Sequence, residues 1–161
     1  MNKFEKISEK QFNKDFWGDS AALYNEIKLP KRATKYSAGY DIYSPIDIVL
    51  FAGATAKIPT GIRVALDEDK FLMIAPRSGL GFKYRLQLDN TVGIIDADYY
   101  NSDNEGHIWV KITNDSRDGK AVEIKAGEAF AQGIIMQYFK TDDDDADGIR
   151  NGGFGSTNGK N

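Results

Sequence analysis

Two short stretches of the chain place polar residues in turns, and one of them combines residue types that suit a phosphate group. PRSGLG (76–81) places a guanidinium of fixed charge, a hydroxyl and two glycines together, a set that can clamp a phosphate group. SAGYD (37–41) places Asp41 directly after a tight turn. Polar residues in turns often form binding sites, because the flanking strands hold them in position. PRSGLG therefore predicts a phosphate clamp and SAGYD a carboxylate placed in a turn; the alternatives are Arg77 in a surface ion pair and Asp41 as a turn former.

A third stretch, DNTVGIIDADYYN (89–101), carries polar groups on both sides of a short apolar strand. Asn90 precedes this strand, and Asp96 and Asp98 follow it, with Tyr99 next in the chain. Binding groups usually lie in turns of this kind, so these polar residues are candidates for a site. The alternative is that Asp96 and Asp98 are ordinary hairpin residues.

Two further stretches lie toward the end of the chain. GEAFAQG (127–133) embeds one amide, Gln132, in an otherwise apolar strand, where it either contacts a ligand or is a satisfied core amide. NGGFGSTNGKN (151–161) surrounds Phe154 with glycines and hydroxyls. Glycine-rich backbone approaches phosphates closely and a phenyl ring stacks on a planar base, whereas a frayed terminus would have the same composition.

The composition limits the partners and the kinds of metal site that this chain can have. The 161 residues suit one domain, and 21 Lys and Arg against 24 Asp and Glu leave a net charge of −3, which predicts no nucleic-acid partner. The absence of cysteine excludes thiolate metal sites, and a single histidine, His107, excludes a histidine-rich centre. Any metal should therefore be a hard cation with oxygen ligands. The chain has no apolar stretch of the length of a membrane span or a signal peptide, so a cytoplasmic location is expected.

One helix is expected near the start of the chain, over residues 9–15. Ser8 and Gln11 have the spacing of a capping box, in which side chains satisfy the free backbone groups of the first turn. Ile7 and Phe12 have the spacing of a hydrophobic staple, which fixes how the chain enters the helix.

Beyond this helix the pattern changes to short strands. Most are separated by Gly, Pro, Asn or Asp, and several alternate apolar with polar residues. The expected strands are 40–44, 47–51, 61–66, 71–75, 85–89, 107–113, 121–125 and 129–139. This spacing predicts an all-β barrel or sandwich. The acidic run 141–147 is typical of a solvated connector, so the barrel should end near Phe139.

Taken together and in order, five motifs resemble those of the trimeric dUTPase family. They are AGYDIYS (38–44), PRSGLG (76–81), NTVGIIDADY (90–99), GEAFAQ (127–132) and GGFGSTNG (152–159). The resemblance implies a distorted jelly-roll barrel of the dUTPase type and a homotrimer with active sites between subunits. It also implies Mg²⁺-assisted hydrolysis of the substrate dUTP to dUMP and pyrophosphate. The single domain, 1–161, would comprise an N-terminal extension with the short helix (1–23), the β-barrel (24–139), and an acidic linker with a flexible glycine-rich lid (140–161).

Residue by residue, the resemblance implies one group that handles the phosphates and the attacking water. Asp41 matches the carboxylate that holds Mg²⁺ through water. Ser78 matches the hydroxyl near the scissile bond, with Arg77 supplying charge at the interface. Asp96 matches the carboxylate that orients the attacking water, and Gln132 the amide beside that water.

A second group is implied for the base, the sugar and the last phosphate. Asn90 matches the amide that reads the uracil edge, and Tyr99 the ring that packs on deoxyribose and excludes a 2′-hydroxyl. Phe154 matches the lid over uracil, and Ser156 and Thr157 match γ-phosphate ligands. The same motifs imply further substrate-binding positions at Gly79, Gly93, Ile95, Arg150 and Gly155.

Three features depart from the family's pattern. Arg150 lies four residues before Phe154, whereas the family commonly has this arginine one position earlier, where this chain has Ile149. Residues 100–106 are an insertion, and His107 at its end is expected to be structural. The N-terminal extension is expected to pack against the barrel, with a site for a protein partner as the alternative.

Two other functions share some of these features. A dCTP deaminase has the same fold and trimer, but that family typically uses a glutamate to activate water where this chain has Asp96. A nucleotide-dependent regulatory protein would bind dUTP to control a partner that the sequence does not identify. Asp96, together with GGFGST (152–157), favours dUTP hydrolysis over both.

Overall fold

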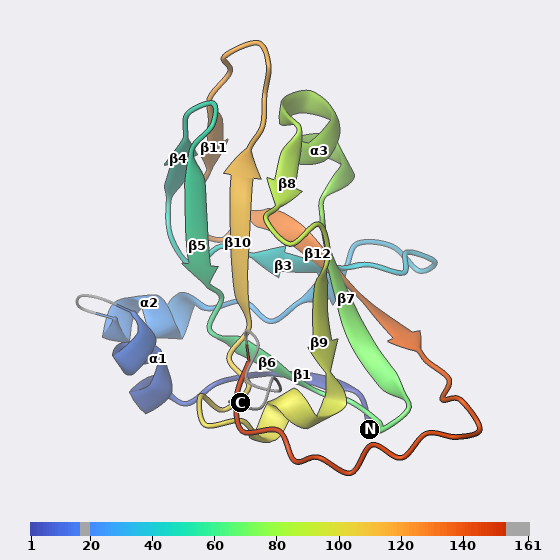
Figure 1. Ribbon diagram of the computed structural model, residues 1–161. Coiled ribbons are helices and arrows are strands. Elements are labelled where there is room, and N and C mark those ends of the chain that lie inside the picture. Colours follow the sequence, from blue (N-terminus) through green and yellow to red (C-terminus); the bar gives the residue numbers. More distant parts are fainter. Residues whose placement is uncertain (17–19, 154–161) are drawn as a thin grey trace, which may run out of the picture.

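The protein is built from antiparallel strands around one apolar core (Figure 1). The computed structural model describes residues 1–16 and 20–153. The paired strands in these residues form four sheets, and neighbouring strands within each sheet run antiparallel. The expectation of an all-β protein with a short N-terminal helix is confirmed, and three further short helices are present in these residues.

The elements follow one another in a regular succession of short segments. The strands are β1 (Lys3–Lys6), β2 (Lys31–Arg32), β3 (Tyr40–Tyr43), β4 (Ile48–Leu50), β5 (Thr55–Pro59), β6 (Ile62–Ala65), β7 (Lys70–Pro76), β8 (Leu86–Leu88), β9 (Gly93–Asp96), β10 (Trp109–Asn114), β11 (Val122–Ile124) and β12 (Ala129–Gln137). The helices are α1 (Glu9–Asp15), α2 (Ala21–Glu26), α3 (Ser78–Tyr84) and the 3₁₀ helix η1 (Ala97–Asn101).

The largest sheet has the strand order β2-β3-β12-β7-β9. Along β7, Leu72 and Ile74 are buried in the core, and the alternation of a strand places Met73 on the opposite face. Ile134 and Ile94 are paired with Met73 and therefore share that outer face. These three side chains make this part of the outer face apolar. Ile94 is 50% exposed, so the described parts of the chain leave this face open.

Three smaller sheets, β5-β10-β8, β11-β4 and β1-β6, complete the enclosure of the core. Their inward residues meet those of the large sheet in one cluster. The largest fully buried side chains include Phe12, Phe130, Ile42, Ile58, Leu72 and Ile112. Side chains of this kind each stabilise the fold by roughly 1.5–3 kcal/mol when fully buried.

The expected helix at residues 9–15 is confirmed as α1. The Ser8 hydroxyl accepts a hydrogen bond from the Gln11 backbone N–H at 3.1 Å and so caps the first turn. Ile7 and Phe12 are both buried, and Phe12 stacks on Phe16 with ring centroids 5.3 Å apart. The helix is short, so its stability depends on this packing rather than on helix propensity.

The stretch 76–81, expected to be a turn, instead leads from β7 into the helix α3, and that expectation is wrong. Its two glycines lower helix propensity, so the sequence favours a turn. Tertiary contacts override this preference, because Leu80 packs against the core. Arg85 then ends the helix in a left-handed conformation (φ 49°, ψ 38°) and donates its backbone N–H to carbonyl oxygens in the last turn of α3.

The N-terminal extension contributes a strand as well as a helix. β1 pairs with β6, from Lys3 opposite Ala65 to Lys6 opposite Ile62. Only Phe4 in this charged segment is buried, so the sequence carries little strand signal and the partner strand supplies the order. The strands β2 and β5 and the helix α2 also fall outside the sequence-based expectations.

The insertion at 100–106 and the N-terminal extension hold each other in place. The Glu105 carboxylate accepts hydrogen bonds from the backbone N–H of Ser8 (2.7 Å) and from its hydroxyl (2.6 Å). The Tyr100 hydroxyl donates to Glu5 at 2.6 Å. These bonds lower the pKa of both carboxyls, because a hydrogen-bonded carboxylate favours its charged form. Two departures from the family's pattern therefore form one structural unit.

His107 joins this unit to the barrel and lies in the core, as expected for a structural residue. Its Nε2 accepts a hydrogen bond from the Gly61 backbone N–H at 2.9 Å, so its Nδ1 carries the proton and donates to Asp15 at 2.6 Å. Burial lowers the pKa of His107, outweighing the opposite effects of Asp15 and Glu105, while Lys57 lowers it further.

This histidine predicts that the protein loses stability in mild acid. Its folded pKa lies below the value of about 6.5 expected in the unfolded chain, so the unfolded chain takes up the proton first as the pH falls. The free energy of unfolding should therefore decrease from about pH 7.5 to about pH 5.5, by at most about 1.4 kcal/mol per pH unit from this group. Urea unfolding at fixed protein concentration measures this slope. His107→Gln should be less stable at neutral pH but should show a flatter dependence, and equal slopes would contradict the assignment.

Candidate active site

Four of the expected site residues meet at one end of the five-stranded sheet. Asp41 on β3 is directly opposite Gln132 on β12, and Gln132 is opposite Ala75 near the end of β7. Arg77 follows β7, and its Nε lies 3.2 Å from the Asp41 carboxylate. Ser78 begins α3 and is exposed. We call Asp41, Arg77, Ser78 and Gln132 the Asp41 cluster.

The position of the Gln132 amide explains the glycine of the SAGYD turn. A Cβ on Gly39 would lie 2.3 Å from Gln132 Oε1, so a larger residue would displace the amide. Gln132 Nε2 donates a hydrogen bond to the Pro76 carbonyl at 3.1 Å. The amide is thus held by β7 on one side and by the turn before β3 on the other.

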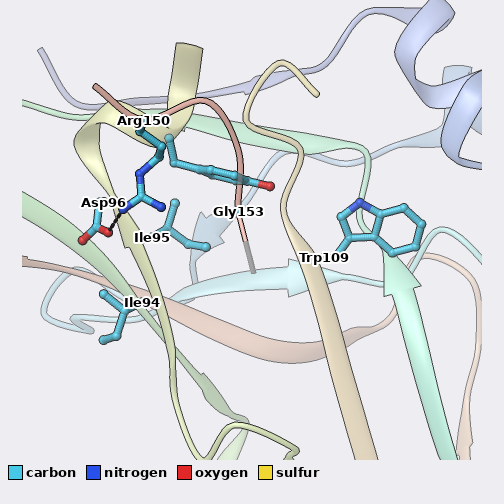
Figure 2. A pocket seen from close by; sticks show the side chains of 7 residues that line it. Ile94, Ile95, Asp96, Trp109, Arg150 and Gly153 are labelled. Carbon is cyan, nitrogen blue, oxygen red and sulfur yellow. Dashed lines mark hydrogen bonds and ion pairs between the residues drawn. The ribbon is translucent and has the colours of Figure 1, made fainter. Parts of the chain in front are cut away.

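A second group lies at the other end of β7, where β9 leads into η1. Asp96 is opposite Phe71, the second residue of β7. Here a cavity of about 100 Å³ is lined by Ile94, Ile95, Asp96, Tyr99, Trp109, Arg150 and Gly153. Figure 2 shows the Arg150 guanidinium directed at Asp96, with Trp109 on the far side of the pocket. We call Asp96, Asp98, Tyr99 and Arg150 the Asp96 cluster.

Arg150 forms ion pairs with both carboxylates of this cluster. Its terminal nitrogen donates to Asp96 at 2.5 Å, and its Nε donates to Asp98 at 2.7 Å. The acidic connector leaves β12 and runs along the lower edge of the molecule in Figure 1, which brings Arg150 back to η1. Arg150 is only 18% exposed on its side chain, whereas Asp96 remains about half exposed. The charge of Asp96 is therefore balanced while one side of its carboxylate remains accessible.

Tyr99 forms a buried wall of the cavity. Its hydroxyl donates to the His107 carbonyl at 2.8 Å and accepts from Asn104 Nδ2 at 2.8 Å. Burial raises the pKa of the Tyr99 phenol, although the hydrogen bond from Asn104 opposes this effect. A Cβ on Gly153 would lie 2.9 Å from the Tyr99 ring, so glycine allows the returning chain to approach the ring closely.

The hairpin between β8 and β9 carries Asn90 and Gly93. Asn90 is exposed in the turn, next to Thr91, which has a left-handed φ of 68°. Gly93 is buried, and a Cβ there would lie 3.1 Å from the Ile74 Cβ. Gly93 thus allows β9 to lie close to β7 at the point where the hairpin joins the sheet.

Within one chain, the two clusters are separated by the length of β7. The residue opposite Asp96 is Phe71 and the residue opposite Gln132 is Ala75. Four steps along a strand at ~3.3 Å per residue give a separation of about 13 Å. The structure therefore brings Asp41, Arg77, Ser78 and Gln132 together, and Ile95, Asp96, Tyr99 and Arg150 together, but it does not join the two groups.

Some expectations concern parts of the chain that the structure does not describe. Phe154, Gly155, Ser156 and Thr157 lie outside the described residues. Within residues 1–16 and 20–153, no group of three or more His, Asp and Glu side chains is placed to hold a metal ion. In the same residues, no helix has the length and apolar character to cross a membrane.

A family model described as dUTPase matches residues 25–158, which include both clusters and the hairpin between them. The chain belongs to the dUTPase family. The match begins just after the N-terminal extension, which therefore lies outside the residues that the family model matches.

Curated relatives agree with this membership. The chain is 40% identical over 134 residues to the deoxyuridine 5′-triphosphate nucleotidohydrolase of Lactococcus lactis, covering 81% of this chain and 88% of that protein. It is 41% identical over 146 residues to the protein of the same name from Hahella chejuensis, covering 86% of this chain and 91% of the relative.

Solved dUTPase structures share the fold. The dUTPase of Streptococcus mutans superposes with a TM-score of 0.67 at 34% identity, over 86% of this chain and 98% of that chain. The dUTPase of phage phi11 of S. aureus has a TM-score of 0.66 at 22% identity, over 92% of this chain and 97% of that chain, and shows similarity of fold alone. The expected jelly-roll type of fold is consistent with both.

The structure adds site residues that the sequence did not indicate. Trp109, Ile94 and Gly153 line the cavity, and Asn104 holds the hydroxyl of Tyr99. Trp109 lies in a stretch with the apolar pattern of a strand, and such a pattern does not distinguish a core residue from one that lines a cavity. Asn104 lies in the insertion, where its polar neighbours indicate only a turn.

Two glycines of the dUTPase motifs should respond in opposite ways to alanine. Gly93→Ala forces Ile74 to move and should destabilise the protein by about 1–3 kcal/mol. Gly79 lies in α3 with open space around it, so Gly79→Ala should leave stability unchanged or raise it by up to about 1 kcal/mol. Urea unfolding of both variants against the parent protein measures this. Equal destabilisation would mean that the surroundings of the two glycines are not as described.

Proposed function

We propose that the protein hydrolyses dUTP to dUMP and pyrophosphate by attack of water on the α-phosphate. The observation that carries this proposal is the position of Asp96, the motif carboxylate of a dUTPase-family chain. Asp96 lies half exposed at the edge of a small cavity whose wall is the buried ring of Tyr99. A carboxylate beside a sugar-sized cavity can orient a water toward a phosphate attached to that sugar.

Release of the site carboxylates from their arginines would accompany binding of the triphosphate. Arg77 is paired with Asp41, and Arg150 with Asp96 and Asp98. A phosphate chain carries more charge than one carboxylate and accepts bidentate hydrogen bonds from guanidinium groups. Transfer of these arginines to the phosphates would leave Asp96 free to accept a proton from water. The positively charged guanidinium groups would then lie beside the phosphate oxygens, whose negative charge must be stabilised.

The phosphate contacts would come from the Asp41 cluster and the nucleoside contacts from the hairpin. The exposed Ser78 hydroxyl and the Gln132 amide would donate to oxygens around the scissile bond. Asn90 and the hairpin backbone would read the uracil edge, because an exchanged donor and acceptor on cytosine would leave buried groups unpaired. Ile95 and Tyr99 would pack against the deoxyribose.

Mg²⁺ fits this site only if water molecules and substrate phosphates supply most of its ligands. Asp41 supplies one carboxylate, 21% exposed, and the described residues contain no larger group of metal ligands near it. Mg²⁺ commonly binds through one or two carboxylates, substrate phosphates and retained water. When bound, it would neutralise charge on the triphosphate, and Asp41 would hold it through its water ligands.

A homotrimer would complete the site. The two clusters are about 13 Å apart on one chain, so a substrate that needs both must take them from different chains. The outer face of the five-stranded sheet lies between them and exposes Met73, Ile94, Ile134 and Met136. A second copy packed on this apolar face would cover it and bring the Asp41 cluster of one chain to the Asp96 cluster of its neighbour.

The alternative of a dCTP deaminase is not favoured. The curated relatives described above are named as nucleotidohydrolases of deoxyuridine triphosphate, and the chain matches them over more than four fifths of its length. In the proposed reaction Asp96 would orient the attacking water, a task that suits a carboxylate.

Replacing the water-orienting carboxylate should abolish turnover while preserving binding. Asp96→Asn keeps the shape of the side chain but removes its basicity, so kcat for dUTP should fall by about two to four orders of magnitude. Binding of a non-hydrolysable dUTP analogue, measured by calorimetry, should change little. Asp98→Asn is the matched control, because it removes the other carboxylate that pairs with Arg150 and should retain most of the turnover. A normal kcat in Asp96→Asn would contradict the role of Asp96.

Mixed subunits should recover activity that neither variant has alone. Asp96→Asn damages one cluster, and the double variant Ser78→Ala/Gln132→Ala damages the other. If each site takes its clusters from two chains of a ring, random reassembly of equal amounts makes about one site in four intact. The two inactive proteins, unfolded and refolded together, should therefore show about a quarter of the activity of refolded parent protein. Absence of recovery would place both clusters of a site in one chain.

A further inference from the structure

The hydroxyl of Tyr99 is held by Asn104, within the insertion 100–106, and by His107, directly after it. Asn104 donates a hydrogen bond to it at 2.8 Å, and the hydroxyl donates to the His107 carbonyl at 2.8 Å. Both partners lie within the segment 104–107. Because Tyr99 is only 6% exposed, these two bonds replace the water that a free phenol would bind.

The turn that carries Asn104 is itself tightly determined. Glu105 and Gly106 both have left-handed backbone angles, with φ of 59° and 71°. A Cβ on Gly106 would lie 2.8 Å from the Tyr99 carbonyl oxygen, so this turn packs directly against η1. Asn104 Oδ1 accepts a hydrogen bond from the Gly106 backbone N–H at 3.2 Å, which leaves the Asn104 amide nitrogen directed at Tyr99.

The left-handed conformation of Glu105 is unfavourable for a residue with a Cβ and needs support from outside the turn. Ser8 supplies it through two hydrogen bonds to the Glu105 carboxylate, at 2.7 and 2.6 Å. Ser8, the N-cap residue of α1, thus holds the turn at Glu105 in place, and this turn holds the Tyr99 hydroxyl through Asn104. The insertion therefore does more than connect η1 to β10.

We propose that Asn104 is a positioning residue for the discrimination between deoxyribose and ribose. It holds the Tyr99 ring against the cavity, where a 2′-hydroxyl of a ribonucleotide would meet the ring. This inference rests on the proposed function, because it assigns the sugar to the Tyr99 side of the cavity. Without Asn104 the phenol keeps only one partner, and the ring can move away from the sugar. The room gained should admit UTP more than it weakens dUTP.

The selectivity between dUTP and UTP tests this proposal. Asn104→Ala should lower the ratio of kcat/KM for dUTP to that for UTP by about tenfold, the worth of one hydrogen bond. Most of the change should be in KM, with kcat for dUTP within about threefold of the parent, since Asp96 is untouched. Asn101→Ala removes an exposed asparagine of η1 and is the matched control, with an unchanged ratio expected.

A double-mutant cycle separates positioning from a general effect on folding. Tyr99→Phe removes the hydroxyl through which Asn104 acts, so Asn104→Ala should have no further effect on the selectivity ratio in that background. An equal additional loss in the Tyr99→Phe background, or an unchanged ratio in Asn104→Ala alone, would overturn the proposal. Urea unfolding of the same variants shows whether any change in the ratio merely follows a loss of stability.

Binding measurements keep this test distinct from that of the proposed function. Calorimetry with dUDP and UDP gives the same selectivity ratio without turnover. A parent protein that bound dUDP but did not hydrolyse dUTP would contradict the proposed function and still allow the role of Asn104 to be measured. Unchanged relative affinity for dUDP and UDP in Asn104→Ala would contradict the role of Asn104 alone.

Discussion

The length and pairing of β7 constrain the whole site. This strand lies between β12 and β9, so it sets the distance between the Asp41 cluster and the Asp96 cluster. An extended backbone hydrogen-bonded on both sides cannot be shortened, because its rise per residue follows from its covalent geometry. The same alternation that buries Leu72 and Ile74 turns the apolar side chains around Met73 outward. One strand therefore separates the two clusters and carries the apolar face through which, in the proposed trimer, a second chain would bring them together.

The second structural theme is the dependence of a cavity wall on the start of the chain. Ser8 caps α1 and binds Glu105, and the Glu105 turn presents Asn104 to Tyr99. Each contact is an ordinary hydrogen bond. The bonds of Ser8 to Glu105 are exposed, whereas the Tyr99 hydroxyl is buried, where a missing partner is costly. His107 closes the same network by joining α1 to β6 through Asp15 and Gly61. The N-terminal extension thus supports one wall of the cavity beside Asp96.

Charge is balanced within the chain before any ligand binds. Asp41 pairs with Arg77, and Asp96 pairs with Arg150. Both arginines pair with a carboxylate because the planar guanidinium donates several hydrogen bonds that match the oxygens of an anion. The acidic connector between β12 and Arg150 is exposed, which leaves Arg150 as the group that joins this segment to the Asp96 cluster. A triphosphate would compete for the same two arginines, so ligand binding and release of the carboxylates are linked.

The sequence by itself determined the family, the residue types of the site and the local elements with strong signals. Ser8, Gln11, Ile7 and Phe12 predicted α1 because capping and stapling act within one turn of helix. It did not determine α3, whose glycines favour a turn, or β1, whose charged residues become a strand only beside β6. Nor did it indicate the bonds of Asn104 to Tyr99 and of Arg150 to Asp96, because these join residues through the folded path of the chain rather than through a repeating pattern. Tertiary structure decided these features, since their energy comes from packing and from partners that no local stretch contains.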